Sequence, residues 1–203
     1  MQKRMILKAL HRVASLGPVY DMIQFIFGVK FIDRRFRRVL EHYPGYHTVL
    51  DIGAGTGRIR NQLSSDCTYY CIDNEMPKLV QLRKTTNGLA ILGDATQTPV
   101  AGASTDLVLC VAMSHHLSDS QLEQALSEVR RVLRPGGVLM FHDALWSPGW
   151  LPGRILWALD RGSNPRSKED LISVLSRYVR IIHQEEFRMV HKYLLLAASS
   201  NGA

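Results

Sequence analysis

The sequence predicts an α/β fold: a doubly wound, mostly parallel β-sheet with helices on both faces. From His47 onward, short apolar runs alternate with helical patterns, and a glycine-rich turn follows the first run. Alternation of strands and helices implies right-handed crossovers and a parallel sheet. Two further strand-like runs lie close together near the end of the chain, and such neighbours should pair as an antiparallel hairpin. The 203 residues fit a single domain.

The composition is that of an ordinary globular protein. Hydrophobic residues make up 46% and charged residues 21% of the chain, which excludes general disorder. No apolar run reaches the roughly 18 residues of a membrane-spanning helix, and the basic N-terminus lacks the apolar stretch of a signal peptide. Three cysteines without metal-ligand spacing argue against a disulfide scaffold and against a metal site. We therefore expect a cytoplasmic protein, and the net charge of +7 selects no anionic partner.

Residues 1–46 are expected to form a helical cap. Apolar residues recur at helical spacing over 3–16, from Tyr20 to about Phe27, and from Val29 to Tyr43. The basic helix over 3–16 either covers the site or lies on a membrane surface, and its modest apolar stripe favours the cover. A peripheral contact with a membrane therefore stays open.

Residues 47–143 are expected to form the core of the sheet. A capping box of Ser118 and Gln121 opens the strongest amphipathic helix, and Pro135 with two glycines ends it. Strands are expected over 48–52, 68–72, 89–92, 107–111 and 138–141, and helices from Arg58, Met76 and Ser118.

Residues 144–166 are expected to leave the sheet as a lid-like segment over the substrate. Three tryptophans fall within twelve residues there, which suits a cover over an apolar or aromatic molecule, with ordinary packing as the alternative. Basic residues around it, Arg166 among them, offer contacts to a phosphate or carboxylate. Residues 167–203 should add a helix capped by Ser167 and then the terminal hairpin.

The strongest local signal is the glycine-rich turn after the first strand. A buried strand ends at Ile52, and Gly53-Ala54-Gly55-Thr56-Gly57 follows at once. Glycine permits positive φ and lets a ligand touch the backbone, and the next helix directs its free N–H groups to the same place. This is the geometry of a nucleotide-type cofactor site at the carboxyl edge of a doubly wound sheet. A turn that serves only packing is the alternative.

Three aspartates lie at the ends of three successive strands. Asp73 follows Asp51 by 22 residues, and Asp94 follows Asp73 by 21. A carboxylate at the second strand end can accept hydrogen bonds from both hydroxyls of a ribose, and one at the third from the amine of adenine. Each alone can equally be a solvated loop or cap residue, but the repeated position argues against coincidence. Arg58 stands where a dinucleotide fingerprint needs its last glycine.

Five motifs follow one another along the chain: VLDIGAGTG at 49–57, Asp73, GDA at 93–95, DLVLCVAMSHHLSD at 106–119 and LRPGGVLMF at 133–141. In this order they resemble those of class I S-adenosylmethionine-dependent methyltransferases, and among them the small-molecule and quinone-biosynthesis enzymes. The resemblance covers residues 48–141 well and the tail loosely. It implies a seven-stranded Rossmann-like sheet with its last strand inserted antiparallel, and S-adenosylmethionine as the cofactor.

The resemblance also implies roles around the cofactor. Asp73 would hold the ribose and Asp94 the adenine. The glycine turn would border the methionine part, with Asp51 near its amino group, directly or through water. Tyr20, which with Asp21 resembles a pair in the quinone subgroup, would reach the cofactor carboxylate or only pack. The implied cofactor residues are Tyr20, Asp51, Gly53, Ala54, Gly55, Gly57, Asp73, Asn74, Met76, Asp94, Ala95, Val111 and Ala112.

Catalysis would require acceptor, methyl group and sulfur to be held in line without water. A hydroxyl acceptor also needs a base. His115 and His116 follow the fourth strand beside the expected methyl group, and His115 is expected to be the more exposed of the two and to act as the base, with packing as the alternative. Asp143, which ends the fifth strand, is the second catalytic candidate and is expected to contact the substrate or to cap the next segment.

The expected reaction is methyl transfer to a small, apolar or aromatic acceptor, such as a quinone-type ring, a lipid or a natural product. A dinucleotide-dependent oxidoreductase and a cofactor-binding module without catalysis are the alternatives. RNA methylation rests only on the net charge, and the fourth strand lacks the N/D-P-P-aromatic motif of nucleic-acid amino-methyltransferases. No nucleic-acid partner is therefore expected.

Overall fold

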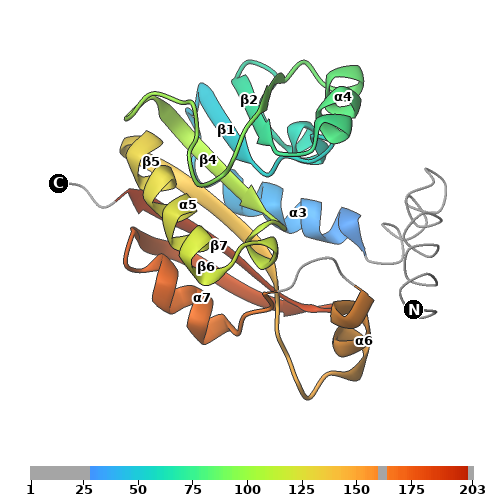
Figure 1. Ribbon diagram of the computed structural model, residues 1–203. Helices are drawn as coiled ribbons and strands as arrows, with labels where there is room; N and C mark the ends of the chain where they lie inside the picture. Colours follow the sequence, from blue (N-terminus) through green and yellow to red (C-terminus); the bar gives the residue numbers. More distant parts are fainter. Residues whose placement is uncertain (1–27, 160–163, 201–203) are drawn as a thin grey trace.

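The computed structural model describes residues 28–159 and 164–200, which form a seven-stranded sheet in the order β3-β2-β1-β4-β5-β7-β6 (Figure 1). Strands β1 to β5 pair in parallel, and β7 is antiparallel to both β5 and β6. The predicted sheet and its terminal hairpin are thus confirmed. The strands are β1 (Thr48–Ile52), β2 (Thr68–Asp73), β3 (Leu89–Leu92), β4 (Thr105–Val111), β5 (Leu133–Leu145), β6 (Val179–Arg188) and β7 (Lys192–Ser200).

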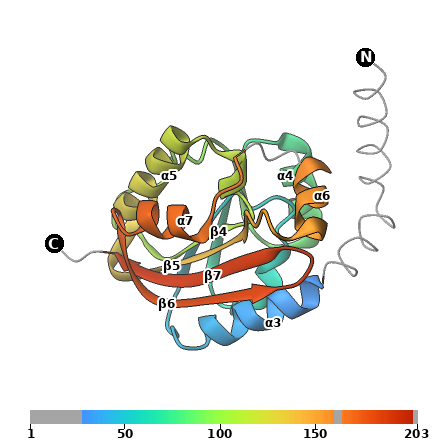
Figure 2. The ribbon, with the colours of Figure 1, turned by 90° about the horizontal axis from the view of Figure 1, so that it is seen from below.

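Helices cover both faces of the sheet, with α3 and α4 on one side and α5 and α7 on the other (Figure 2). None of the described helices is long and apolar enough to cross a membrane. The predicted helices over 3–16 and 20–27 lie outside the described residues. The helices are α3 (Val29–Leu40), the 3-10 turns η1 (Arg58–Gln62) and η2 (Ser114–His116), α4 (Met76–Thr85), α5 (Asp119–Val132), α6 (Leu151–Leu159) and α7 (Lys168–Leu175).

The alternation of side chains along the central strands builds two cores. Leu107 and Leu109 pack with the α3 and α4 side, while Val108 and Cys110 pack with the α5 and α7 side. A strand with both faces buried must be apolar throughout, which explains the uninterrupted apolar run of β4. The three cysteines are buried and unpaired.

Several boundaries differ from the predicted ones for local reasons. Helix α3 ends at Leu40 rather than Tyr43, because the N–H groups of His42 and Tyr43 bond three residues back, at 3.1 and 2.9 Å, and tighten the last turn. Strand β5 begins at Leu133, before Pro135, where the preceding helix was expected to end. The reason is that Leu133 pairs with Thr105 across a register shift in β4. The capping box predicted at Ser118 and the helix cap predicted at Ser167 are both present.

Gly57 lies where a side chain would be strained and would also collide. Its φ is +78°, and a Cβ atom there would lie 2.9 Å from Cγ of Leu82. Gly136 has the same φ of +78° but open space around it. We expect Gly57→Ala to lower the free energy of unfolding by about 2–4 kcal/mol, and Gly136→Ala by only about 1–2 kcal/mol, the cost of the left-handed backbone. Urea denaturation measures both, and equal losses would contradict the packing argument.

Candidate functional site

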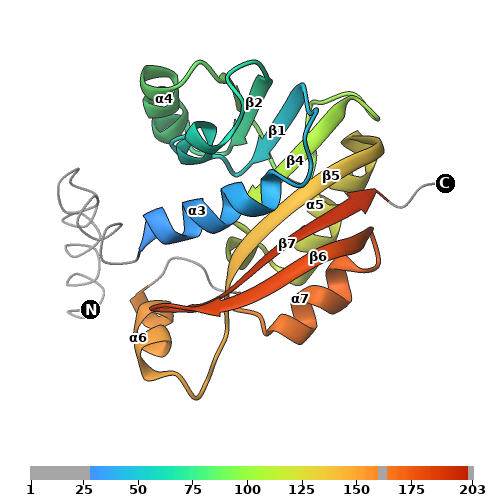
Figure 3. The ribbon, with the colours of Figure 1, turned by 180° about the vertical axis from the view of Figure 1, so that it is seen from behind.

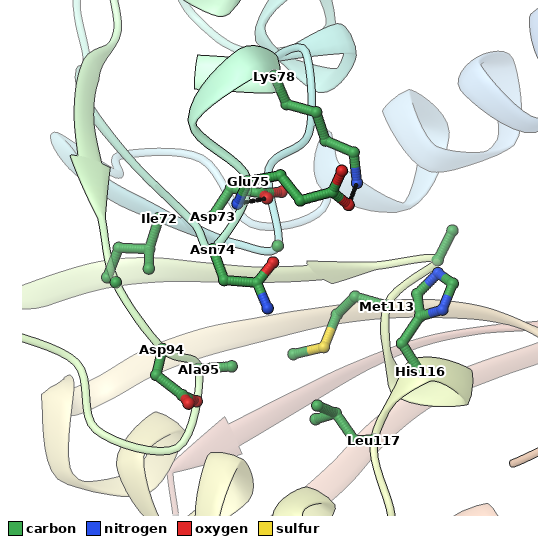
Figure 4. A pocket seen from close by; sticks show the side chains of 13 residues that line it. Ile72, Asp73, Asn74, Glu75, Lys78, Asp94, Ala95, Met113, His116 and Leu117 are labelled. Carbon is green, nitrogen blue, oxygen red and sulfur yellow. Dashed lines mark hydrogen bonds and ion pairs between the residues drawn. The ribbon is translucent and has the colours of Figure 1, made fainter. Parts of the chain in front are cut away.

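A cavity of about 380 Å³ opens where the carboxyl ends of β1, β2, β3 and β4 meet. This edge is where open α/β sheets bind their ligands, and the volume falls within the about 300–1,000 Å³ of small-molecule sites. Figure 4 shows the side chains that surround it. The lining residues are Gly53, Ile72, Asp73, Asn74, Glu75, Lys78, Gly93, Asp94, Ala95, Ala112, Met113, His116 and Leu117.

The structure brings part of the predicted cofactor set to this cavity. The glycine turn and the end of β4 lie beside the cavity. Asp51 lies beneath the turn, and Met76 is 51% exposed on α4, so neither lines the cavity. Tyr20 lies outside the described residues. Four further lining residues were not predicted, because only the fold shows which side chains point inward: Glu75, Lys78, Met113 and Leu117. His116 was expected beside the methyl group but not as a cofactor residue. The predicted residues in the lining are Gly53, Asp73, Asn74, Asp94, Ala95 and Ala112.

Asp73 ties the glycine turn to the end of β2. Its two carboxylate oxygens accept hydrogen bonds from the N–H groups of Gly55 and Glu75, each at 2.9 Å. Gly53 N–H bonds to the Ile72 carbonyl at 2.8 Å, so the turn folds back over the neighbouring strand. Each carboxylate oxygen has a second lone pair, so Asp73 can accept further hydrogen bonds from a ligand.

Small side chains at the turn make room for that ligand. A Cβ atom on Gly53 would lie 2.8 Å from Cβ of Met113, whereas a Cβ atom on Gly55 would meet open space. Gly53 therefore allows the turn to pack against Met113 in the cavity wall, and Gly55 leaves its backbone open to a ligand.

Asp94 supplies a second carboxylate to the cavity. The N–H and hydroxyl groups of Thr96 both donate to its Oδ1 atom at 2.8 Å. These hydrogen bonds lower the pKa of Asp94 below its usual range, so the group is ionised at neutral pH. Lys78 and Glu75 form an ion pair of 2.6 Å on the same lining (Figure 4).

Asp51 differs from the other two aspartates because it is almost fully buried. The Tyr69 hydroxyl donates a hydrogen bond to its Oδ2 atom. Burial raises the pKa of Asp51 to about 7, although the hydrogen bond from Tyr69 and the charge of Arg58 oppose the shift. The carboxyl group of Asp51 beneath the glycine turn therefore changes from its protonated to its ionised form near neutral pH.

The raised pKa of Asp51 makes a prediction about stability. The folded protein keeps this proton up to about pH 7, while the unfolded chain loses it near the ordinary aspartate pKa of 3.8. The stability that this proton contributes is therefore full below pH 3.8 and is lost as pH rises from there through 7. The difference is on the order of 4 kcal/mol. We expect Asp51→Asn to remove this pH dependence and to be more stable than the native chain at pH 8. Denaturation at pH 5 and pH 8 measures it, and parallel losses in both proteins would refute it.

A second group of polar side chains lies behind the cavity wall, where η2 meets β5. Asp143 is only 1% exposed. The distance from His115 Nδ1 to Asp143 Oδ1 is 2.6 Å, and the Ser114 hydroxyl donates to Asp143 Oδ2. Burial alone would raise the pKa of Asp143, but the neighbouring His115 and hydrogen bonds from His115, Ser114 and Ala144 outweigh it and lower the pKa to about 2. Asp143 is therefore a buried carboxylate anion.

This arrangement corrects one expectation. His115 is 8% exposed, whereas His116 is exposed and lines the cavity, so the prediction that His115 is the more exposed histidine is wrong. The physical reason is the contact with Asp143: the His115 ring bonds to this buried carboxylate and is therefore buried with it. Both oxygens of Asp143 accept hydrogen bonds from groups of the chain. The catalytic roles of His115 and Asp143 stay predictions.

The predicted lid-like segment approaches the same histidine. α6 lies beside the turn between β6 and β7 (Figure 3), and the indole N–H of Trp150 bonds to the Val190 carbonyl at 2.7 Å. The ring of Trp157, 8% exposed, meets the His115 ring edge-on with centroids 5.5 Å apart. No group of metal-ligating side chains is present among the described residues.

Comparison with known proteins agrees with this geometry. Residues 50–141 match the family model described as "Methyltransferase domain". The chain also superimposes on the N-methyltransferase NodS from Bradyrhizobium japonicum in complex with S-adenosyl-L-homocysteine, with a TM-score of 0.76, 16% identity, and coverage of 97% of this chain and 98% of that one. The matched domain and the fold agree with the class I S-adenosylmethionine-dependent methyltransferases that the motifs resemble. At 16% identity the superposition itself shows the methyltransferase fold alone.

Curated relatives of this chain carry several names. The uncharacterized methyltransferase OB1106 from Oceanobacillus iheyensis is 29% identical over 141 residues, which is 64% of each chain. The malonyl-[acyl-carrier protein] O-methyltransferase of Xylella fastidiosa is 35% identical over 99 residues, 45% of this chain and 33% of that protein. Other relatives are named as tRNA methyltransferases. The matches cover 46% to 64% of the length of four relatives.

Proposed function

We propose that this protein transfers the methyl group of S-adenosylmethionine to a hydroxyl group of a small, apolar or aromatic molecule. One observation carries the proposal: the cavity that Asp73 and Asp94 line at the sheet edge shares a wall with a buried histidine–carboxylate pair. The cavity is bordered by η2 through His116, and the next residue in the same turn, His115, bonds to Asp143.

The residues of the cavity fit the cofactor. Gly55, in the turn next to the lining residue Gly53, has open space on its Cα, and Asp73 keeps acceptor capacity for the two hydroxyls of a ribose. The ionised Asp94 suits the amine of an adenine, with Ala95 beside it. When bound, the cofactor supplies a methyl group that its sulfonium makes electrophilic. The roles of these residues toward the cofactor are part of the proposal.

His115 would take the proton of the acceptor. A carboxylate anion can only accept hydrogen bonds, so Asp143 requires the hydrogen of the neutral His115 ring to be on Nδ1. Nε2 is then the basic nitrogen, and Asp143 stabilises the imidazolium that forms when it is protonated. Ser114 and the Ala144 N–H fix the carboxylate in turn.

The aromatic side chains of the α6 segment support the acceptor class. Trp157 packs on the His115 ring, and Trp146 nearby is 37% exposed. An aromatic or apolar molecule would bury its surface well against such rings. The relatives' names include an acyl-carrier-protein and tRNA substrates, so they do not favour one acceptor class.

Two measurements test the proposal. Calorimetric titration with S-adenosylhomocysteine should show binding, while NADH should show none. Incubation of a cell extract with the protein and a deuterium-labelled methyl donor should yield a labelled small molecule by mass spectrometry. Binding of NADH alone would favour an oxidoreductase. Binding of S-adenosylhomocysteine without any methyl transfer would indicate a module without catalysis.

A further inference from the structure

Arg166 is buried behind the site and uses every hydrogen that it can donate. Its side chain is 8% exposed. Nη1 donates to the carbonyls of Ser114 at 2.8 Å and Asn164 at 3.4 Å. Nη2 donates to the Leu117 carbonyl at 2.7 Å and to Asp119 Oδ1 at 2.8 Å, and Nε donates to the same oxygen at 2.9 Å. A guanidinium has five N–H donors, and all five point at acceptors of the chain.

Two of these acceptors are carbonyls of the turn that carries the histidines. The last carbonyl groups of a short helix have no partner within it, and a positive charge near them is favourable. Ser114 begins η2, and its carbonyl already accepts from the Leu117 N–H at 3.1 Å, so Arg166 adds a second hydrogen bond there. Leu117 follows η2, and Arg166 supplies both a hydrogen bond and the charge at its carbonyl. It therefore closes the end of this turn from outside.

The backbone around Arg166 is tied to the same region from two sides. The Asn164 N–H donates to the His115 carbonyl at 3.1 Å, and the Trp146 N–H donates to the Arg166 carbonyl at 2.8 Å. Residues 164–166 thus bridge η2 and the chain that leaves β5. The expectation that Arg166 meets a phosphate or carboxylate of the substrate is not what the structure shows, because its carboxylate partner is Asp119.

We propose that Arg166 is a positioning residue for the site: its guanidinium holds residues 114–119 so that His115 stays on Asp143. The same hold keeps His116 and Leu117 in the cavity wall. The purpose of this arrangement, a fixed base beside the cofactor, rests on the proposed function. The hold itself rests only on the contacts of Arg166.

The shape of the guanidinium makes the proposal specific to arginine. Its donors spread over a planar fork and reach two carbonyls and a carboxylate at once, whereas a lysine ammonium has three donors on one atom. Arg166→Lys keeps the charge and most of the volume but cannot make all of these contacts. A role that needs only positive charge would survive this change, and positioning of the turn would not.

The test uses the full chain with Arg166→Lys. Proton NMR should show a downfield resonance of the His115 Nδ1 hydrogen in the native protein, assigned by its loss in His115→Ala. We expect Arg166→Lys to lose this resonance and to bind S-adenosylhomocysteine about 10-fold more weakly. The matched control is Arg177→Met, because Arg177 lines the same groove between α5 and α7 but pairs with Glu123 at 2.9 Å, and it should change neither readout.

A folded Arg166→Lys protein with the native resonance would overturn the proposal. If that variant does not fold, Asp119→Ala decides, because it removes the oxygen that accepts from Nε and Nη2 of Arg166. The Asp119 side chain is 91% exposed, so its replacement leaves the core intact. Asp119→Ala should weaken or broaden the resonance, and an unchanged resonance would overturn the proposal. Should the native protein bind no S-adenosylhomocysteine, the proposed function fails, while the resonance still tests Arg166.

Discussion

Replacing His115 with alanine should slow methyl transfer by about 10²- to 10⁴-fold, the usual contribution of a general base, and leave the affinity for S-adenosylhomocysteine nearly unchanged. The rate should change without the affinity because His115 lies behind the cavity wall, whereas its neighbour His116 lines the cavity. Single-turnover kinetics with the acceptor that the extract experiment identifies measure the rate, and calorimetry measures the affinity.

The pH profile separates a base from a packing residue. A general base accepts a proton only in its unprotonated form, so any fall of the native rate at low pH that His115 causes should vanish in His115→Ala. Asp143→Asn should also slow transfer, because an amide cannot stabilise the imidazolium. The control is His42→Ala, since His42 is exposed and, within residues 28–159 and 164–200, its ring bonds only to the nearby Arg38 carbonyl at 2.8 Å. Full activity of His115→Ala would remove it as the base.

Replacing Asp73 with alanine should weaken binding of S-adenosylhomocysteine by about 1–3 kcal/mol, or about 5- to 150-fold, the scale of a lost buried hydrogen-bond partner. Two effects add: the ligand loses an acceptor, and the Gly55 N–H loses the bond that holds the glycine turn. Titration calorimetry measures the change.

The control for Asp73 is Asp66→Ala. Asp66 is an exposed aspartate before β2, at the opposite end of that strand, and its Oδ1 atom accepts only from the adjacent Ser65 hydroxyl at 2.8 Å among the contacts of the described chain. It should leave the affinity as it is. If Asp73→Ala also binds with native affinity, the ribose role of Asp73 is wrong.

Local sequence signals predicted the elements of the sheet well. β1 and β3 have the predicted ends, Thr48–Ile52 and Leu89–Leu92, because turns and glycines bound each short apolar run. The end of α3 and the start of β5 were wrong, since a tightened last turn and a pairing across a register shift depend on contacts distant in sequence. Tertiary contacts of this kind leave no local pattern.

The site was predicted where spacing along strands determines it, and not where side-chain direction does. Asp73 and Asp94 follow from their positions at strand ends. The inward turn of His115 and the burial of Arg166 depend on partners 28 and 52 residues away, Asp143 and Ser114. A sequence without its fold gives no way to choose these partners among several equally suitable ones.

The buried thiols have a practical consequence. Burial raises the pKa of Cys71 and Cys110, and only the thiolate reacts readily with alkylating reagents. Iodoacetamide should therefore modify these sulfurs only during moments when the central strands separate. The rate of modification would measure how often such openings occur. It would allow the opening rates of all the variants above to be compared without any knowledge of the acceptor.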